Sequence, residues 1–214
     1  MINRRILLSA GLALTLMTAT VWPGSAGAAS AEEGAKAFLN NMADQAIRSL
    51  TKSGVSRPER IEHFRKLFKN NFAARTIGKW ILGRYWRKAT PEQQKEYFNL
   101  FEDLIVVSYV DRFAQYTGEG LKIIKTLAHN DRVTTVFSEI QQQGSTTPVR
   151  VDWRISKTST SFKVVDVVVE GTSMSITMKS DFGSIIRQKG GKIAGLLEVL
   201  RDKTASLKKE AAAK

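Results

Sequence analysis

The sequence predicts an α+β fold, in which helices gather on one side of an antiparallel meander sheet of about four to five strands. Three observations lead to this prediction. Apolar residues recur with the spacing of helices from about residue 31 to 116. The spacing changes to that of strands between 121 and 170, and after Gly171 it returns to that of helices. Two of the connections between strands are short, which favours antiparallel neighbours.

The N-terminal stretch 1–28 has the order of a cleavable signal peptide. A positive pair precedes an uncharged apolar run, a helix breaker and two small residues: Arg4-Arg5, 6–21, Pro23-Gly24, Ala26 and Ala28. A membrane anchor needs roughly 20 apolar residues, and this run is shorter, so we expect cleavage after Ala28 or Ala29 and a periplasmic protein. Arg4-Arg5 also loosely fits a twin-arginine signal. Sec export fits better, because nothing later suggests a cofactor that is loaded before export.

Residues 29–214 have the length of a single domain with its own core. Removing Arg4 and Arg5 from the 33 basic side chains leaves 31 against 20 acidic ones, a net charge of about +11. In an exported protein this excess favours anionic headgroups or an acidic partner over nucleic acid, with solubility alone as the alternative. Cysteine is absent, which excludes thiol catalysis and thiolate metal sites. We expect a soluble protein, since no second apolar run could span a bilayer, and we expect it to be a monomer.

Three helices are predicted before residue 84. The first covers about 31 to 51, and its apolar stripe consists of Ala35, Phe38, Leu39, Met42, Ala43, Ala46, Ile47 and Leu50. Pro58 fits the first turn of the second helix, whose stripe consists of Ile61, Phe64, Leu67 and Phe68. Asn70-Asn71 can cap the third helix, which ends at Gly83 and carries Phe72, Ile77, Trp80 and Ile81.

The clearest helix start lies at 90–93. Thr90 as the cap, Pro91 in the first turn and Gln93 at the third position form a capping box. The helix runs to about Tyr116 and is stopped by Gly118 and Gly120. Its predicted buried face consists of Phe98, Phe101, Leu104, Ile105, Tyr109, Val110 and Phe113.

Four strands follow, at 121–127, 132–140, 149–156 and 162–170. Asn130-Asp131 lies close to a hairpin turn between the first two strands. Apolar residues alternate with polar ones in the third strand, which predicts one face on the core and one in water. The fourth strand is more continuously apolar, so we expect both of its faces to be covered.

Two helices close the chain. Ser180-Asp181 can cap the first of them, which carries Phe182, Ile185 and Ile186 and ends at Gly190-Gly191. The last helix is marked by Ile193, Leu196, Leu197, Leu200 and Leu207. Residues 208–214 are predicted to form a polar helical tail with nothing to pack against.

The chain lacks a recognisable set of catalytic residues or metal ligands. His63 and His129 lie far apart in sequence and lack the spacing of a metal site. The stretch 49–52 matches Ser-x-x-Lys but lacks the companion motifs. Asp166, which lies among valines, could act as an acid or base, although such a residue more often faces out or takes a backbone or arginine partner. The sequence therefore favours binding over catalysis and predicts neither a cofactor nor a metal.

Aromatic and basic residues interleave at Lys79-Trp80 and at Arg84-Tyr85-Trp86-Arg87-Lys88. Such a pattern could stack nucleobases, but export argues against nucleic acid. One interpretation buries the tryptophans in the core while the cations reach water. The other places these side chains at the mouth of a pocket, with the cations beside a phosphate.

Two stretches resemble the MlaC/toluene-tolerance family. Residues 83–93, followed by Phe98 and Phe101, are similar to the region that leads into the long helix of that family. Residues 166–174 are similar to its final-strand signature, and the stretch onward to Leu200 is similar to its C-terminal helices. The resemblance covers essentially the whole chain behind the leader, in order.

The resemblance implies a periplasmic protein that holds phospholipid acyl chains in a deep apolar cavity between helices and sheet. It also implies shuttling of lipid between an outer-membrane lipoprotein complex and an inner-membrane ABC transporter complex, with transient proximity to the membrane. One branch of the family occurs with hopanoid-synthesis genes (HpnM-like), so hopanoid or another polycyclic lipid is the alternative ligand. An exported enzyme and an interaction module without a small ligand are the remaining alternatives.

The strongest candidates for lipid contact lie on the inward faces of the long helix and the sheet: Phe101, Ile105, Tyr109, Val151, Trp153, Val167, Val169 and Met174. Further positions complete the expected lipid-binding set: Trp80, Tyr85, Trp86, Phe98, Phe113, Val165, Thr172, Phe182, Ile186 and Leu197. Any of these residues could instead belong to an ordinary core. Many relatives carry an apolar residue in place of Thr172, which leaves the lining at that position open.

Overall fold

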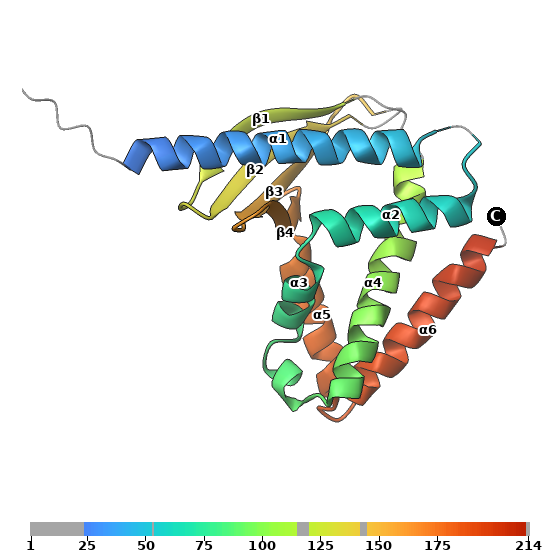
Figure 1. Ribbon diagram of the computed structural model, residues 1–214. Coiled ribbons are helices and arrows are strands. Elements are labelled where there is room, and N and C mark those ends of the chain that lie inside the picture. Colours follow the sequence, from blue (N-terminus) through green and yellow to red (C-terminus); the bar gives the residue numbers. More distant parts are fainter. Residues whose placement is uncertain (1–23, 53, 115–119, 142–144, 213–214) are drawn as a thin grey trace, which may run out of the picture.

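The computed structural model describes residues 24–52, 54–114, 120–141 and 145–212. The elements follow one another as helices, strands and helices, which confirms the α+β class (Figure 1). In chain order they are α1 (Gly24–Leu50), α2 (Arg57–Asn71), α3 (Ala74–Leu82), the 3₁₀ helix η1 (Gly83–Lys88), α4 (Pro91–Ala114), β1 (Leu121–Ala128), β2 (Val133–Ile140), β3 (Val149–Lys157), β4 (Phe162–Val169), β5 (Thr172–Ser173), α5 (Met174–Gln188) and α6 (Ile193–Ala212). Most of the predicted leader lies outside the described residues, and cleavage after Ala28 stays a prediction.

The described strands form one sheet in the order β1-β2-β3-β4-β5, and all neighbouring strands are antiparallel. This is the meander that the short connections predict. Val151, Trp153 and Ile155 of β3 are buried on one face, because alternate residues of a strand point to the same side. The pairing of β3 with β4 skips Val165. This bulge lets Val164 and Val167 both join the core on that face.

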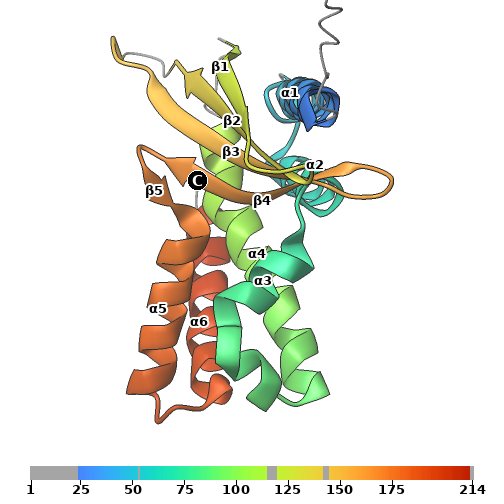
Figure 2. The ribbon, with the colours of Figure 1, turned by 90° about the vertical axis from the view of Figure 1, so that its left-hand side faces the viewer.

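α1 packs against this face of the sheet (Figures 1 and 2). Its buried residues Ala35, Leu39 and Met42 form, with side chains of β2 to β4, what we call the sheet core. The N-terminal half of α1 is fixed to the edge strand by Glu32. The carboxylate of Glu32 accepts hydrogen bonds from the Thr126 hydroxyl and from the Ala128 amide, both at 2.8 Å. These two bonds lower the pKa of Glu32 and satisfy an amide of the edge strand.

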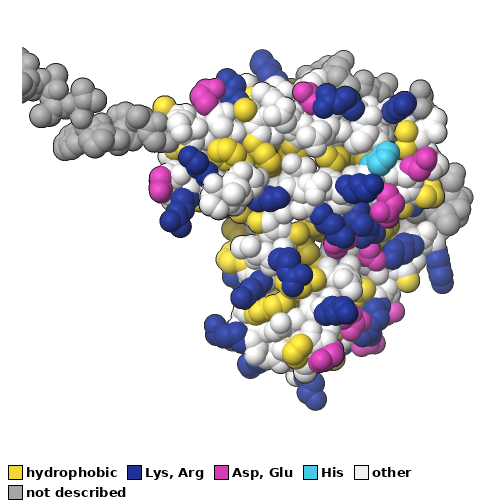
Figure 3. Space-filling view, in the orientation of Figure 1, with side chains coloured by type: hydrophobic (Ala, Val, Ile, Leu, Met, Phe, Trp, Pro, Cys, Tyr) yellow, Lys and Arg dark blue, Asp and Glu magenta, His cyan; other side chains and the backbone are white. Residues whose placement is uncertain are grey.

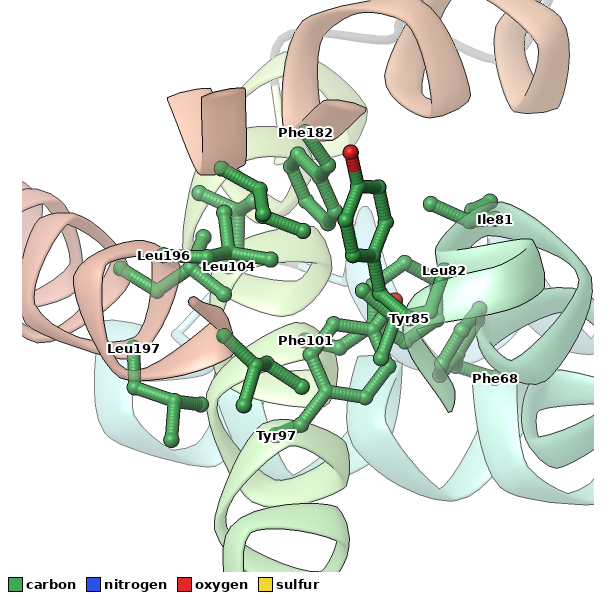
Figure 4. Packing of buried hydrophobic residues seen from close by; sticks show 13 residues of the cluster. Phe68, Ile81, Leu82, Tyr85, Tyr97, Phe101, Leu104, Phe182, Leu196 and Leu197 are labelled. Carbon is green, nitrogen blue, oxygen red and sulfur yellow. The ribbon is translucent and has the colours of Figure 1, made fainter. Parts of the chain in front are cut away.

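A second core, the helical core, lies among α2 to α6 (Figures 2 and 4). Tyr97 and Phe101 of α4 stack with ring centroids 5.8 Å apart, and Phe182 of α5 meets Tyr97 edge-on. The Tyr97 hydroxyl donates a hydrogen bond of 3.1 Å to the Gly78 carbonyl oxygen of α3. In the part of the chain that the structure describes, no helix has both the length and the apolar content that crossing a membrane requires.

The predicted capping box of α4 is confirmed. The Gln93 amide donates to Thr90 Oγ1 at 3.3 Å, and the Thr90 amide donates to Gln93 Oε1 at 3.1 Å. A second capping box, formed by Ser56 and Glu59 at the start of α2, was not among the sequence predictions. The predicted cap of α3 is wrong, because Asn71 is still part of α2 and donates to the Leu67 carbonyl oxygen.

The start predicted for α5 at Ser180-Asp181 is also wrong. The chain leaves β4 through a tight turn in which Glu170 and Gly171 both have positive φ, 48° and 78°. β5 and α5 follow at once, and the Ser173 hydroxyl caps α5 by accepting from the Ile176 amide. The helical pattern was predicted to return after Gly171, but the cap was placed too late, because serines and threonines such as those of 172–177 are poor helix formers and compete with the helix for hydrogen bonds.

The C-terminal tail is less isolated than the sequence predicts. α6 continues to Ala212, and Lys208 forms an ion pair of 2.6 Å with Asp103 of α4. Leu207 packs partly buried against the helical core. The tail is therefore attached to α4 at least as far as Lys208.

Candidate functional site

A cavity of about 720 Å³ lies between the two cores. Its wall is formed by residues of α1 to α5 and of β1 to β4. Leu39 and Trp153 in this wall belong to the sheet core, whereas Phe68 and Phe101 belong to the helical core. The space therefore exists because the sheet core and the helical core do not close on each other.

The lining of the cavity is almost entirely apolar. Among the described residues that line it, the polar side chains are Thr51, Asp166, Ser175 and the hydroxyl-bearing Tyr109. A volume of this size with a mostly apolar wall and few polar groups is typical of a site for an apolar ligand. Protein cores normally pack without voids larger than a water molecule, so an empty space of this size is not ordinary core packing.

Trp153 presents its ring to the cavity without exposing a polar group there. Its indole N–H donates to the Ser138 hydroxyl at 3.0 Å, and that hydroxyl donates to the Val151 carbonyl oxygen at 2.6 Å. All three residues are buried in β2 and β3. A buried indole needs such a partner, and the sheet supplies it, which leaves the carbon face of the ring as wall.

Asp166 is the charged residue at the cavity, and both of its oxygens are engaged. Oδ1 accepts from the Ser175 hydroxyl at 2.6 Å and from the amides of Val167 and Ser175 at 3.0 and 3.2 Å. Oδ2 accepts from the Ser173 hydroxyl at 2.7 Å and from Arg154 at 3.1 Å. These bonds join β4 to β3 and to the first turn of α5. The geometry favours the structural interpretation of Asp166 over an acid–base role.

The strongest sequence candidates all lie on one cavity wall. They come from α4, β3, β4 and the start of α5: Phe101, Ile105, Tyr109, Val151, Trp153, Val167, Val169 and Met174. The inward faces of the long helix and of the sheet therefore meet at one space, as the resemblance to the MlaC/toluene-tolerance family implies.

The remaining candidates do not line the cavity. Tyr85, Phe182, Ile186 and Leu197 are buried in the helical core, where α5 packs against α3 and α6 packs against α4. Figure 4 shows Tyr85, Phe182 and Leu197 in this core. Trp86 and Phe98 pack on each other near the start of α4, with ring centroids 5.0 Å apart. Trp80 and Thr172 are exposed, and Val165 is the half-buried bulge residue. Phe113 belongs to α4, but its side chain lies outside the described residues.

The aromatic and basic stretch 79–88 therefore does not frame the cavity mouth. Tyr85 is buried and Trp86 is half-buried, while Lys79, Arg84, Arg87 and Lys88 are exposed. This matches the interpretation in which aromatic rings pack and cations reach water. Trp80 departs from it, because 45% of its surface is exposed.

The sequence predictions missed the part of the wall that α1 and α2 supply. Its members are apolar residues that face the sheet: Met42, Ala43, Ala46, Ile47, Leu50, Phe64, Leu67 and Phe68. The apolar stripes of both helices are evident in the sequence. A stripe indicates burial but does not reveal whether the opposite surface closes on it. The small side chains in the α1 stripe, Ala43 and Ala46, are the signal in the sequence that the opposite surface does not close on this helix.

A smaller hollow of about 330 Å³ adjoins the cavity at the seam between α1 and α2. Its described lining consists of Gln45, Arg48, Ser49, His63, Lys66, Leu67 and Asn70. Leu67 lines both spaces. His63 Nδ1 lies 2.9 Å from the Ser49 carbonyl oxygen and so carries its proton on that nitrogen. The hollow is therefore polar and basic, in contrast to the cavity beside it.

Comparison with known proteins agrees with this architecture. A family model described as MlaC protein matches residues 40–202. The intermembrane phospholipid transport system binding protein MlaC of Haemophilus influenzae is 27% identical over 117 residues, which are 53% of this chain and 54% of that protein. The match thus spans about half the length of that curated relative. The solved structure of a phospholipid-binding protein from Ralstonia solanacearum, in complex with a phospholipid, has a similar fold, with a TM-score of 0.73 at 24% identity over 81% of this chain and 98% of that one.

Proposed function

Because the chain belongs to the MlaC family, we propose that it is a lipid carrier that holds the acyl chains of a phospholipid in the cavity between its two cores. The observation that supports this most directly is the apolar cavity of about 720 Å³. The H. influenzae relative is named for phospholipid transport, and the R. solanacearum structure contains a phospholipid. Both agree with the proposal.

The physical reason for such a cavity is the cost of exposing lipid to water. Each methylene group transferred from water to an apolar wall gains about 0.8 kcal/mol. A lipid with roughly 30 acyl carbons would therefore cost on the order of 25 kcal/mol to leave free in an aqueous compartment. A carrier has to offer a wall of similar extent. The carrier releases its lipid only when a partner or an opening motion offsets this loss.

The acyl chains would contact two groups of residues. The first consists of the inward-facing candidates of α4, the sheet and α5, such as Phe101, Tyr109 and Trp153. The second is the wall from α1 and α2, which includes Ala46 and Leu67. We expect no catalytic step, since Asp166 is fully engaged in hydrogen bonds that hold β4 to α5.

Lipid extraction tests the proposal. Organic extracts of the purified protein should contain lipid close to a one-to-one ratio, as measured by mass spectrometry. Ala46→Trp places a large side chain in the cavity and should lower the lipid content several-fold. Ala37→Trp is the matched control, because Ala37 lies on α1 but is exposed. A lipid-free wild-type protein, or equal lipid in both variants, would count against the carrier.

The basic hollow supports a phosphate-bearing lipid over hopanoid. Arg48, His63 and Lys66 line it, and the wall residue Leu67 separates it from the cavity. Neither Arg48 nor Lys66 takes part in an ion pair among the described residues. A lipid whose chains fill the cavity could place its phosphate there, where Arg and Lys donate charge-assisted hydrogen bonds. Hopanoid carries no phosphate in its ring system and would leave these cations unused.

The identity of the extracted lipid decides between the two ligands. We expect phospholipid, and we expect that replacing Arg48 and Lys66 together by Ser lowers its recovery. Replacing the exposed Lys36 and Lys122, which lie away from the hollow, by Ser should leave recovery unchanged. Recovery of hopanoid, or of phospholipid unaffected by the first pair of changes, would overturn the phosphate assignment while leaving the carrier proposal intact.

The place of this carrier would be the periplasm, between an outer-membrane lipoprotein complex and an inner-membrane ABC transporter complex. The predicted leader and the family membership support that setting. Fractionation of cells that express the full chain tests it. The mature protein should appear in the periplasmic fraction, shortened to begin at about residue 29.

A further inference from the structure

The surface formed by α3, η1 and the first turns of α5 combines exposed apolar side chains with a strong positive charge. Trp80 and Ile176 are 45% and 55% exposed, and they are two of the four large apolar side chains with this much exposure in the part of the chain that the structure describes. The two segments 74–88 and 174–188 carry seven basic residues and a single acidic one, Asp181. Figure 3 shows hydrophobic and basic side chains side by side over α3. We call this surface the α3–α5 patch.

The residues of the patch contact one another. The Lys179 ammonium of α5 lies 3.9 Å from the centroid of the Trp80 ring of α3. Lys79 lies 5.8 Å from the centroid of the Trp86 ring. A hydrogen bond from Arg84 and the charges of Arg84, Arg187 and Lys88 lower the pKa of Tyr85, which indicates that cations from η1 and α5 converge there. Ile176 lies one turn before Lys179 on α5 and so on the same face, which makes the patch a surface that two helices share.

We propose that the α3–α5 patch docks the protein onto a bilayer that contains anionic phospholipids. An exposed indole beside Lys and Arg is the combination that anchors proteins at the headgroup level of a membrane. The side chains of Trp80 and Ile176 enter the headgroup region of the bilayer, and the surrounding lysines and arginines bind the lipid phosphates. In the two segments the basic residues outnumber the acidic one by seven to one, which matches the many phosphates of an anionic bilayer.

The docking geometry would bring the cavity to the membrane. α3 and α5 present Trp80 and Ile176 outward, while Ile77, Met174 and Met178 of the same two helices line the cavity. Lipid would then pass between bilayer and cavity across a single layer of helices. This step rests on the proposed carrier function, whereas the docking itself does not.

Vesicle flotation tests the docking. The purified protein should float with vesicles in which about a third of the lipid is phosphatidylglycerol, and much less with pure phosphatidylcholine. Lys179→Glu and Lys79→Glu should each weaken binding roughly fivefold or more, because each nearby cation contributes about that factor. Trp80→Ala and Ile176→Ser should also weaken it several-fold. Added salt should release the wild-type protein.

The edge strand β1 supplies matched controls. Ile124 is 47% exposed and Lys122 is exposed on the same strand, away from the patch. Ile124→Ser and Lys122→Glu repeat the chemical changes and should bind vesicles as the wild type does. Thermal melting checks that all variants fold. No flotation with anionic vesicles, equal losses in the β1 variants, or capture of an acidic protein in place of vesicles would each overturn the proposal.

Lipid content, measured on the same samples, separates this proposal from the carrier. Patch variants that lose flotation but keep their extracted lipid support docking as a separate function of the surface. A lipid-free protein that still floats with anionic vesicles would contradict the carrier proposal and support the docking proposal.

Discussion

Asp166 connects three elements through five hydrogen bonds to its two oxygens. Its partners are Arg154 on β3, Val167 on β4, and Ser173 and Ser175 at the start of α5. The side chain of Asp166 is 6% exposed and that of Arg154 is 46% exposed. The hydrogen bonds therefore matter more than the ion pair, because the arginine charge stays in water after the aspartate is lost.

Asp166→Ala should lower the free energy of unfolding by about 3 kcal/mol, since it leaves buried donors at Ser173 and Ser175 without their acceptor. Urea unfolding measures this change. Asp152→Ala is the control, because Asp152 is also buried but, among the described residues, its carboxylate accepts side-chain hydrogen bonds only from the exposed Arg150. We expect a cost of about 1 kcal/mol there. A loss for Asp166→Ala no greater than for Asp152→Ala would contradict the role assigned to Asp166.

Tyr97 makes stability depend on alkaline pH. Burial raises its pKa well above the ordinary value. A raised folded-state pKa means that the folded protein holds the proton more tightly than the unfolded chain does. The resulting stability is fully present below the unfolded pKa of about 10 and is lost as the pH rises above it.

Tyr97→Phe should therefore flatten the fall in unfolding free energy between about pH 10 and pH 12. At neutral pH the same change should cost about 1 kcal/mol, because the Gly78 carbonyl oxygen loses its donor. Denaturant unfolding at several pH values measures both effects. Tyr85→Phe is the comparison, since the pKa of Tyr85 is lowered, and it should not flatten the profile. A profile for Tyr97→Phe as steep as that of the wild type would refute the assignment.

At the scale of elements, apolar periodicity and capping chemistry predicted most helices and strands. The start of α4 was predicted correctly because Thr90 and Gln93 form hydrogen bonds with each other, and no distant partner is needed. The start of α5 was predicted wrongly because it depends on Asp166, whose hydrogen bonds to Ser173 and Ser175 hold the first turn in place. Tertiary contacts of this kind have no trace in local spacing.

The same distinction explains the cavity. Val151 and Trp153 were predicted as wall from strand alternation, which fixes the face to which a side chain points. Ala46 and Leu67 were missed, because their place at the wall depends on how far α1 and α2 stand from the sheet. Helix spacing indicates which face is buried, but the distance to the opposite surface is a property of the whole fold.

α2 is a part of the cavity wall that ion pairs help to hold in place. Only Phe68 and Asn71 are buried among its described residues, and ion pairs attach it to α4. Arg57 pairs with Asp111 at 2.9 Å, and Arg65 reaches Glu102 and Asp103 at 2.6 and 2.9 Å. These ion pairs are half-buried, and at the edge of the solvent each contributes on the order of 1 kcal/mol and is screened in part by salt.

Arg65→Gln should therefore raise hydrogen exchange of the α2 amides roughly fivefold, while the amides of α4 and α6 stay protected. Added salt should act in the same direction. Arg201→Gln breaks a pair between α6 and Glu96 and should leave exchange in α2 unchanged. Uniform exchange changes across the helices would show that α2 is not a separately opening wall.

For the whole molecule, two cores that do not meet give a fold with a space in its centre. The sheet core under α1 and the helical core around α4 each bury their own residues. Among the described residues, the partly buried Phe72 packs against both cores. The apolar wall between the cores lacks contacts when the space is empty, which forfeits dispersion energy. A bound acyl chain would supply these contacts and couple the two cores.

Removal of lipid should therefore destabilise the protein as a whole. A ligand present at about 100 times its Kd stabilises the folded state by about 2.7 kcal/mol. For a chain of this size we expect delipidation to lower Tm by roughly 5 to 10 °C, measured by calorimetry. Added phospholipid should restore Tm in proportion to the logarithm of its concentration. Ala46→Trp should melt at nearly the same temperature with and without lipid, because the new indole side chain occupies the cavity. Ala37→Trp should respond to lipid like the wild type.

A wild-type Tm that does not change with lipid would mean that the two cores are stable without an occupant. That result would remove the energetic basis for lipid binding in the cavity.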